Sequence, residues 1–345
     1  MRGLTDTGCG ALSLILSILV GGATSGQACT VPVFRYAMDH WPADMYELRA
    51  PTSESLDDAT LLNPFRDHPA INWRIREEET LDSSAQLLSP FPGDPLLWEG
   101  SLDRESLDRL VDSPARQAVL EGLLEGDSTV WVVVGDTDGS FAARIQNRLD
   151  YLEQVVEIPP QDPLDPENKL GPGPALKVGF SVVSVDYEDP KESAFIAMLA
   201  GPKRERLLES KTPFASPVFG RGRALDAWTA EELDDVGIDD ACIFLISACS
   251  CQVKDQNPGW DLLLHCYWEK ELIEADDRRL AMGQPETSEP TVYTPPAPET
   301  VTFAPEAPAA SSETEETESE PWTSVGILIA LAAAGVVFLF RAKKG

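Results

Sequence analysis

The stretch Thr129-Val-Trp-Val-Val-Val134 decides the fold class of this chain. Its unbroken run of mostly β-branched residues predicts a strand that is buried on both faces. Downstream, apolar residues recur at helical spacing, which predicts an amphipathic helix over residues 140–156. Upstream, Ser113-Pro114 provides an N-cap and a first-turn proline for a helix that ends near Gly126. A strand between two helices indicates an α/β fold.

The alternation of strands and helices continues toward the C-terminus. Residues 178–185 predict a strand, and Asp189-Pro-Lys-Glu192 resembles a capping box for a helix that ends at Gly201. Residues 241–247 (ACIFLIS) predict another buried strand. Weaker patterns predict a helix within residues 102–111. Further strands are predicted at residues 31–36, 46–49, 71–75 and 217–219.

The final part of this region predicts a β-hairpin. Residues 249–254 and 260–267 flank the turn-forming sequence Asp255-Gln-Asn-Pro-Gly259. Just ahead of them, Thr229 to Glu232 has the spacing of a second capping box, with Gly237 as the expected end of its helix. An order of strands and helices that closes with a hairpin is also found in thioredoxin-like folds, although this is an analogy at the level of the fold.

Prolines and glycines between residues 159 and 174 are too dense for the interior of a helix or strand. They predict a linker between two consecutive small α/β halves. The predicted boundaries are a first α/β domain at 29–160, a linker at 161–174 and a second α/β domain with a C-terminal β-hairpin at 175–283.

Both ends of the chain predict a position outside the cytoplasm. A short apolar core and a small-residue cleavage site identify residues 1–28 as a secretory signal peptide. Residues 284–321 are rich in Pro, Thr, Ala and Glu and predict a disordered acidic stalk. Residues 322–340 carry no charge and as a helix span about 28 Å, which fits a transmembrane helix. The basic stub 341–345 then faces the cytoplasm.

The membrane is therefore one expected partner, through a single-pass anchor. The same arrangement of stalk, apolar helix and basic stub is typical of C-terminal sorting signals, in which case the helix is cleaved off. A formal net charge of −31 argues against a nucleic-acid partner, because phosphates require a basic surface. A protein partner in the cell envelope agrees with this location.

Six cysteines occur, and an oxidising compartment favours structural disulfides for them. Cys29 follows the signal cleavage site and is a candidate for lipidation. Across the predicted hairpin, Cys249 and Cys251 face His265 and Cys266, with Cys242 as a further partner. Thiolates and an imidazole brought together in this way would allow Zn or Cu(I) binding, or thiol redox chemistry. No Cys-x-x-Cys motif is present, which counts against an ordinary disulfide oxidoreductase.

A second candidate site is the basic, glycine-containing sequence Gly220-Arg-Gly-Arg223. Backbone N–H groups at Gly220 and Gly222, together with the guanidinium groups of Arg221 and Arg223, could hold an anion. The alternative is that both arginines pair with acidic residues of the same chain. No hydrolase or nucleotide-binding motif is present in the sequence.

Three segments resemble an uncharacterised group of planctomycete-type bacterial cell-envelope proteins. They are residues 29–37 (CTVPVFRYA) with Trp41-Pro42, residues 217–225 (PVFGRGRAL), and residues 248–254 (ACSCQVK) with Asn257-Pro-Gly259. The resemblance implies an exported envelope protein with thioredoxin-like halves. It implies no activity, substrate or cofactor.

Together these features predict a membrane-anchored, extracytoplasmic envelope protein with a non-catalytic, interaction or structural role. The alternative from a different class is a thiol-redox or metal-handling envelope protein that uses Cys249 and Cys251.

Overall fold

The computed structural model places the strand Thr129–Val134 (β5) inside a mixed sheet, between β7 and β6. The strand order is β10-β8-β7-β5-β6, and β9 also pairs with β7. β5 and β6 are parallel, whereas β7 runs antiparallel to β5 and to β8. The other strands of this sheet are β6 (Phe180–Val185), β7 (Phe214–Phe219), β8 (Arg223–Ala224), β9 (Trp228–Thr229) and β10 (Trp260–Asp261).

The structure describes residues 30–81, 84–91, 93, 95–161, 166–249 and 252–285. The predicted signal peptide, Cys29, the transmembrane helix and the basic stub lie outside these residues, as does the stalk from residue 286 onward. Among the described residues, no helix is both long and apolar enough to cross a membrane.

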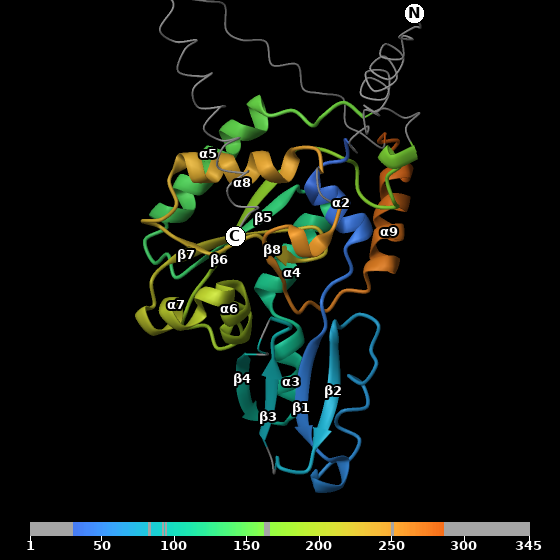
Figure 1. Ribbon diagram of the computed structural model, residues 1–345, viewed down its shortest axis with the longest axis vertical. Coiled ribbons are helices and arrows are strands. Elements are labelled where there is room, and N and C mark those ends of the chain that lie inside the picture. Colours follow the sequence, from blue (N-terminus) through green and yellow to red (C-terminus); the bar gives the residue numbers. More distant parts are fainter. Residues whose placement is uncertain are drawn as a thin grey trace, which may run out of the picture. The chain divides into compact units, whose positions relative to one another are not determined.

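A second, smaller sheet has the order β2-β1-β3-β4. β1 and β2 are parallel, and the other two pairs are antiparallel. Figure 1 shows this sheet together with helix α3 in the lower part of the view, away from β5. Its strands are β1 (Tyr46–Pro51), β2 (Trp73–Glu78), β3 (Ser84–Leu88) and β4 (Leu96–Ser101).

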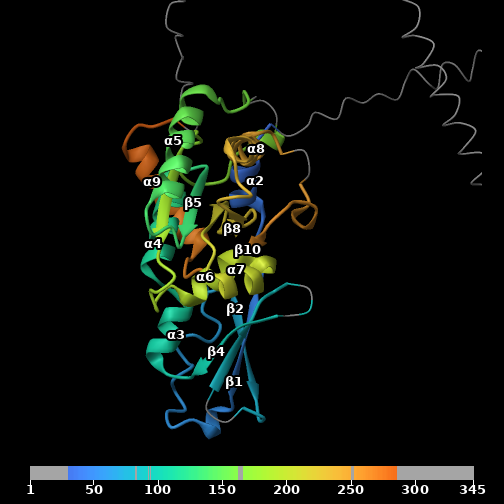
Figure 2. The ribbon, with the colours of Figure 1, turned by 90° about the vertical axis from the view of Figure 1, so that its left-hand side faces the viewer.

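Helices cover both faces of the large sheet. On one face α2, α5 and α8 pack on Trp131 and Val133, and Figure 2 shows α2 directly beside α8. On the other face α4, α6 and α9 pack on Val130 and Val132. The helices are α2 (Val33–His40), α3 (Arg104–Val111), α4 (Pro114–Glu125), α5 (Ser140–Val155), α6 (Ser193–Ala200), α7 (Arg204–Ser210), α8 (Asp235–Ile246) and α9 (Trp268–Ala281).

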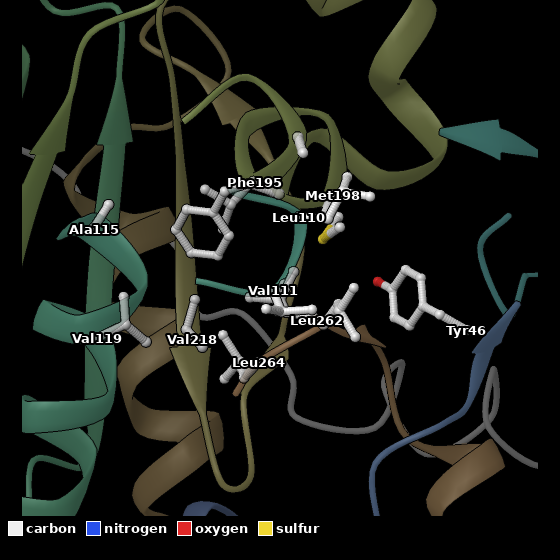
Figure 3. Close-up of a cluster of buried hydrophobic side chains, with 14 of the residues drawn as sticks. Tyr46, Leu110, Val111, Ala115, Val119, Phe195, Met198, Val218, Leu262 and Leu264 are labelled. Atoms are coloured by element: carbon white, nitrogen blue, oxygen red, sulfur yellow. The ribbon is translucent and has the colours of Figure 1, made fainter. Parts of the chain in front are cut away.

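The small sheet and the large sheet share one hydrophobic core. Tyr46 of β1, Met198 of α6 and Leu262, which follows β10, belong to the same buried cluster. Figure 3 shows the Tyr46 ring directed toward Leu262 and Met198. The Tyr46 hydroxyl donates to Asp261 O at 2.7 Å, which satisfies its only donor inside the core. The result is a mixed α/β body with two sheets.

The elements predicted from strong local patterns are confirmed. β5 is buried along its whole length, and α5 begins and ends within one residue of its predicted bounds. Ser113 Oγ accepts from Arg116 N as the N-cap of α4, and Gly126 ends that helix in a left-handed conformation. The Thr229–Glu232 capping box also forms, with reciprocal bonds of 3.0 and 3.3 Å.

Two predicted strands are helices instead. Residues 31–36 were expected to be extended, but α2 begins at Val33 and buries Val33, Phe34, Ala37 and Met38 on one side. Residues 241–247 were also expected to be a strand, but they complete α8. The buried residues of α8 recur with a helical period: Ile238, Ala241, Cys242, Leu245 and Ile246. Gly237 does not end a helix here, because its N–H bonds the N-cap Asp234 at 2.8 Å.

The predicted β-hairpin is wrong. Residues Lys254–Gln256 form a short 3-10 turn, and β10 pairs with β8 rather than with the described residues 249 and 252–254. Gly259 makes this pairing possible, since it has φ +103° and a Cβ atom there would lie 2.3 Å from Ala224 O. Residues 249 and 265 are therefore not opposite one another on a hairpin.

The predicted linker is fixed against the N-terminal helix. Arg35 of α2 donates to Pro174 O at 2.7 Å and to Gly171 O at 2.5 Å. Asp39 accepts from Gly171 N at 3.0 Å. This segment joins α5 to β6. β5 precedes the predicted linker in the sequence and β6 follows it, and the two strands pair in parallel. The two predicted halves thus contribute strands to one sheet.

Candidate functional site

Asp261 of β10 lies at the centre of a buried ion network. Its Oδ1 accepts from Arg223 Nη1 of β8 at 2.9 Å, and its Oδ2 accepts from Lys254 Nζ. The backbone N–H of Asp44 also donates to Oδ2, at 2.6 Å. Only 5% of the Asp261 side chain and 7% of the Arg223 side chain are exposed. A carboxylate removed from water in this way needs such partners, and Asp261 has one cation on each oxygen.

Arg223 uses its remaining donors to hold the loop that precedes β10. Nε donates to Pro258 O at 3.1 Å, and Nη2 donates to Asn257 O at 3.1 Å and Gly259 O at 2.8 Å. Its guanidinium carbon lies 5.8 Å from the centre of the Trp41 ring. The planar fork of arginine suits this simultaneous bonding of several carbonyls.

Lys254 connects the same network to the segment after α2. Its Nζ donates to Pro42 O and to Asp44 Oδ1, both at 2.7 Å. Trp41 Nε1 donates to Gln252 O at 3.1 Å. The network therefore brings together parts of all three segments on which the envelope-protein resemblance rests, although they are far apart in the sequence.

The residues predicted to bind an anion have partners within the chain. Arg221 donates to Met38 O at 2.7 Å and to Glu269 Oε1 at 2.9 Å. Gly220 has φ +58°, and a Cβ atom there would lie 2.7 Å from Ala37 Cβ. Gly222 has φ +85°, and a Cβ atom there would lie 2.3 Å from a Leu264 methyl carbon. Close packing and backbone conformation therefore explain both glycines.

The described cysteines do not form one cluster. Cys242 and Cys249 lie in the core that contains α2, α5 and α8. Cys266 lies in the core on the other face of the large sheet. Cys251 is outside the described residues. Cys242 and Cys266 are free thiols, and the side chains of all three described cysteines are buried.

Burial also suppresses the reactivity of two of these thiols. It raises the pKa of Cys242 to about 12 and that of Cys266 to about 12. The thiolate is the nucleophile and the metal ligand, so both groups are overwhelmingly protonated and unreactive at neutral pH. Among the described residues, no three His, Cys, Asp or Glu side chains are grouped so as to hold a metal ion.

A pair of histidines was not anticipated from the sequence. The ring centres of His68 and His265 lie 5.2 Å apart at an angle of 72°. Ile71 forms an isolated antiparallel bridge with His265, and Cys266 N donates to Ala70 O at 2.7 Å. This bridge links a loop before β2 with the segment before α9. No local spacing of residues in the sequence predicts it.

The histidine pair lies between two adjoining pockets of about 420 and 340 Å³, which both contact His68 and His265. Asp108 and Asp112 of α3 line the smaller one. Ala70 N donates to His68 Nδ1 at 3.3 Å, which places the proton of a neutral imidazole on Nε2. Burial and the neighbouring His68 lower the pKa of His265.

Comparisons of this chain with protein-family models, curated proteins and solved structures gave no match. Its function is therefore inferred from its own residues.

Proposed function

We propose that this chain is a single-pass, membrane-anchored protein of the bacterial cell envelope, related to the planctomycete-type group that its three motif segments resemble. Its body lies outside the cytoplasm and has a non-catalytic role in binding or structure. The signal-peptide pattern of residues 1–28 and the apolar span 322–340 support the location. The Pro/Glu-rich residues 284–321 serve as the stalk, and the basic residues 341–345 support the orientation.

The observation that carries the non-catalytic role is the closed network around Asp261. The residues of the motif segments would be the natural place for a catalytic set, yet their cations Arg223 and Lys254 both pair with Asp261, which lies outside those segments. Arg223 and Asp261 are almost fully buried, and Lys254 is 13% exposed. A catalytic centre needs a group that can reach a substrate, whereas these groups hold chain segments together.

The strand connectivity supports a thioredoxin-like unit within the body. Two parallel strands, β5 and β6, are followed by the antiparallel strands β7 and β8, with the order β6-β5-β7-β8. Helix α5 connects the parallel pair, and α8 follows β8. This supports one such unit rather than one in each predicted half. The likeness concerns connectivity alone, and so it carries no activity with it.

The alternative is a thiol-redox or metal-handling protein that uses Cys249, Cys251, Cys266 and His265. The two proposals differ in measurable chemistry. Purified full-length protein is titrated with a thiol reagent before and after unfolding, and its metal content and its disulfide-exchange activity are determined.

The non-catalytic proposal expects Cys242 and Cys266 to react only after unfolding, with no stoichiometric metal and no exchange activity. A bound metal, or a readily reduced cystine, that disappears in Cys249→Ser would overturn it and support the alternative. The mass of the mature protein tests the anchor separately, because removal of residues 322–345 identifies a cleaved sorting signal.

A further inference from the structure

The strand Phe180–Val185 (β6) has one long edge that no other described strand pairs with. β6 is the last strand in the order of the large sheet, and among the described residues its only strand partner is β5. Phe180 N points away from β5, because it donates to Glu153 Oε1 of α5 at 2.7 Å. Backbone groups alternate along a strand, so those of Val182 and Ser184 also point outward. Within the part of the chain that the structure describes, no strand lies beside these outward groups.

The side chains of β6 leave this edge unprotected. The strand reads Phe-Ser-Val-Val-Ser-Val and contains no charge, and Ser184 is exposed. The outer strand β2 of the small sheet is different, because it carries Arg74, Arg76, Glu77 and Glu78. Charged residues of this kind normally prevent an edge strand from pairing with other chains. The chain has a net charge of −31, yet the six residues of this edge strand carry no charge that would keep other strands from pairing with it.

Acidic groups lie at both ends of the β6 edge. At its start Glu153 bonds Phe180 N, and Asp127 interacts electrostatically with Glu153. Lys177 lies 3.8 Å from Asp127. At its end Asp186 follows Val185 directly in the chain. An uncharged edge with an acidic group at each end favours a strand that carries positive charge at its ends.

We propose that the β6 edge binds an extended segment of a partner protein, with an uncharged, β-forming centre of about six residues and Lys or Arg at both ends. The segment adds a strand to the large sheet over about 20 Å. Backbone hydrogen bonds to Val182 and Ser184 hold it, and its basic residues meet Glu153, Asp127 and Asp186. This inference rests on the proposed non-catalytic role and supplies a partner class for it.

A second copy of this chain is a poorer occupant. Two-fold pairing of β6 with itself is antiparallel, because a two-fold axis reverses the strand direction. The start of one strand would then face the end of the other, and Glu153 and Asp127 would approach Asp186 of the second copy. Like charges placed opposite one another across a strand pair are destabilising.

The test uses three synthetic nonapeptides and full-length protein in detergent. The first peptide is Lys-Lys-Thr-Val-Thr-Val-Thr-Lys-Lys with blocked ends. The second has Glu in place of Lys, and the third keeps the lysines but has Pro in place of both valines. Fluorescence anisotropy of labelled peptides should show binding of the first and none of the second. The third should bind at least about tenfold more weakly, since proline removes backbone donors.

Protein variants locate the binding to β6. Val182→Pro removes one outward N–H at a position where an edge strand tolerates proline. This variant should bind the first peptide about tenfold more weakly. Ser184→Lys places a positive charge at the exposed edge and should weaken it several-fold, while the matched variant Ser184→Gln should not. Thermal unfolding of each variant verifies that it folds. If Val182→Pro does not fold, the comparison of the three peptides on the wild-type protein still tests the inference.

Equal binding of the lysine-containing peptides with and without proline would overturn the inference, because it would indicate charge attraction without a strand. A concentration-dependent dimer in sedimentation that Ser184→Lys disrupts would also overturn it, in favour of a second copy. Neither result bears on the thiol and metal measurements, so this inference and the proposed function can fail separately.

Discussion

The ion network at Asp261 and the histidine pair at His265 both join segments that are distant in the sequence, yet they differ in charge balance. Asp261 is opposed by Arg223 and Lys254 and is almost completely buried. His68 and His265 are like groups beside two pockets. A closed set of opposite charges stabilises one arrangement of the chain, whereas an open pair of titratable groups responds to pH.

The largest effect is expected when the network loses its central carboxylate. Asp261→Asn leaves the buried Arg223 without its counter-charge and Lys254 with only the half-exposed Asp44, and should lower the free energy of unfolding by about 3–5 kcal/mol. Urea denaturation followed by tryptophan fluorescence measures the change. The matched variant Asp255→Asn alters an exposed aspartate nearby and should stay within about 0.5 kcal/mol. A loss for Asp261→Asn as small as that of its control would show that the network does not stabilise the fold.

A smaller loss is expected at the outer member of the network. Lys254→Met removes the bonds to Pro42 O and Asp44, but Asp261 keeps Arg223. The expected loss is about 1–2 kcal/mol in the same denaturation experiment. Lys270→Met is the control, because Lys270 is 59% exposed and pairs with Glu271 and Glu274 at the surface. A loss of stability in Lys254→Met as large as that in Asp261→Asn would show that Arg223 alone does not compensate the buried Asp261 carboxylate.

The elements that local chemistry specifies were predicted from the sequence. The buried strand β5, the caps of α4 and the amphipathic face of α5 depend on residues within one or two turns of one another. The errors occurred where composition and period disagree. Residues 31–36 and 241–247 are rich in β-forming apolar side chains, but their buried positions follow a helical period that extends beyond each segment.

The sites depend on tertiary contacts, and there the sequence was less informative. The sequence Gly220-Arg-Gly-Arg223 indicates a candidate site by its charges and glycines. It does not indicate that Asp261 is the partner of Arg223, because Asp261 follows a loop whose course the sequence does not reveal. The predicted hairpin would have placed Cys249 beside His265, whereas the structure pairs His265 with His68. Local propensity carries no information on which strands from different parts of the chain become neighbours.

The histidine pair gives the smallest effect and the only one that depends on pH. Burial and His68 lower the pKa of His265, so the unfolded chain binds more protons than the folded chain as the pH falls below about 6.5. The protein should therefore lose stability as the pH falls from about 6.5 through the folded pKa, and its stability should not depend on His265 above that range. Melting temperatures measured between pH 7.5 and 5 (about the range in which histidine titrates) record this slope.

His265→Gln should remove part of the slope, and His40→Gln should leave it unchanged because His40 is exposed and lies beside Tyr36 rather than another histidine. Asp108 and Asp112 favour the protonated imidazole and so limit the effect. Asp112→Asn should therefore steepen the slope in the wild-type background and have no such influence in His265→Gln. An unchanged slope in His265→Gln would mean that burial of His265 does not make the stability of the protein depend on pH.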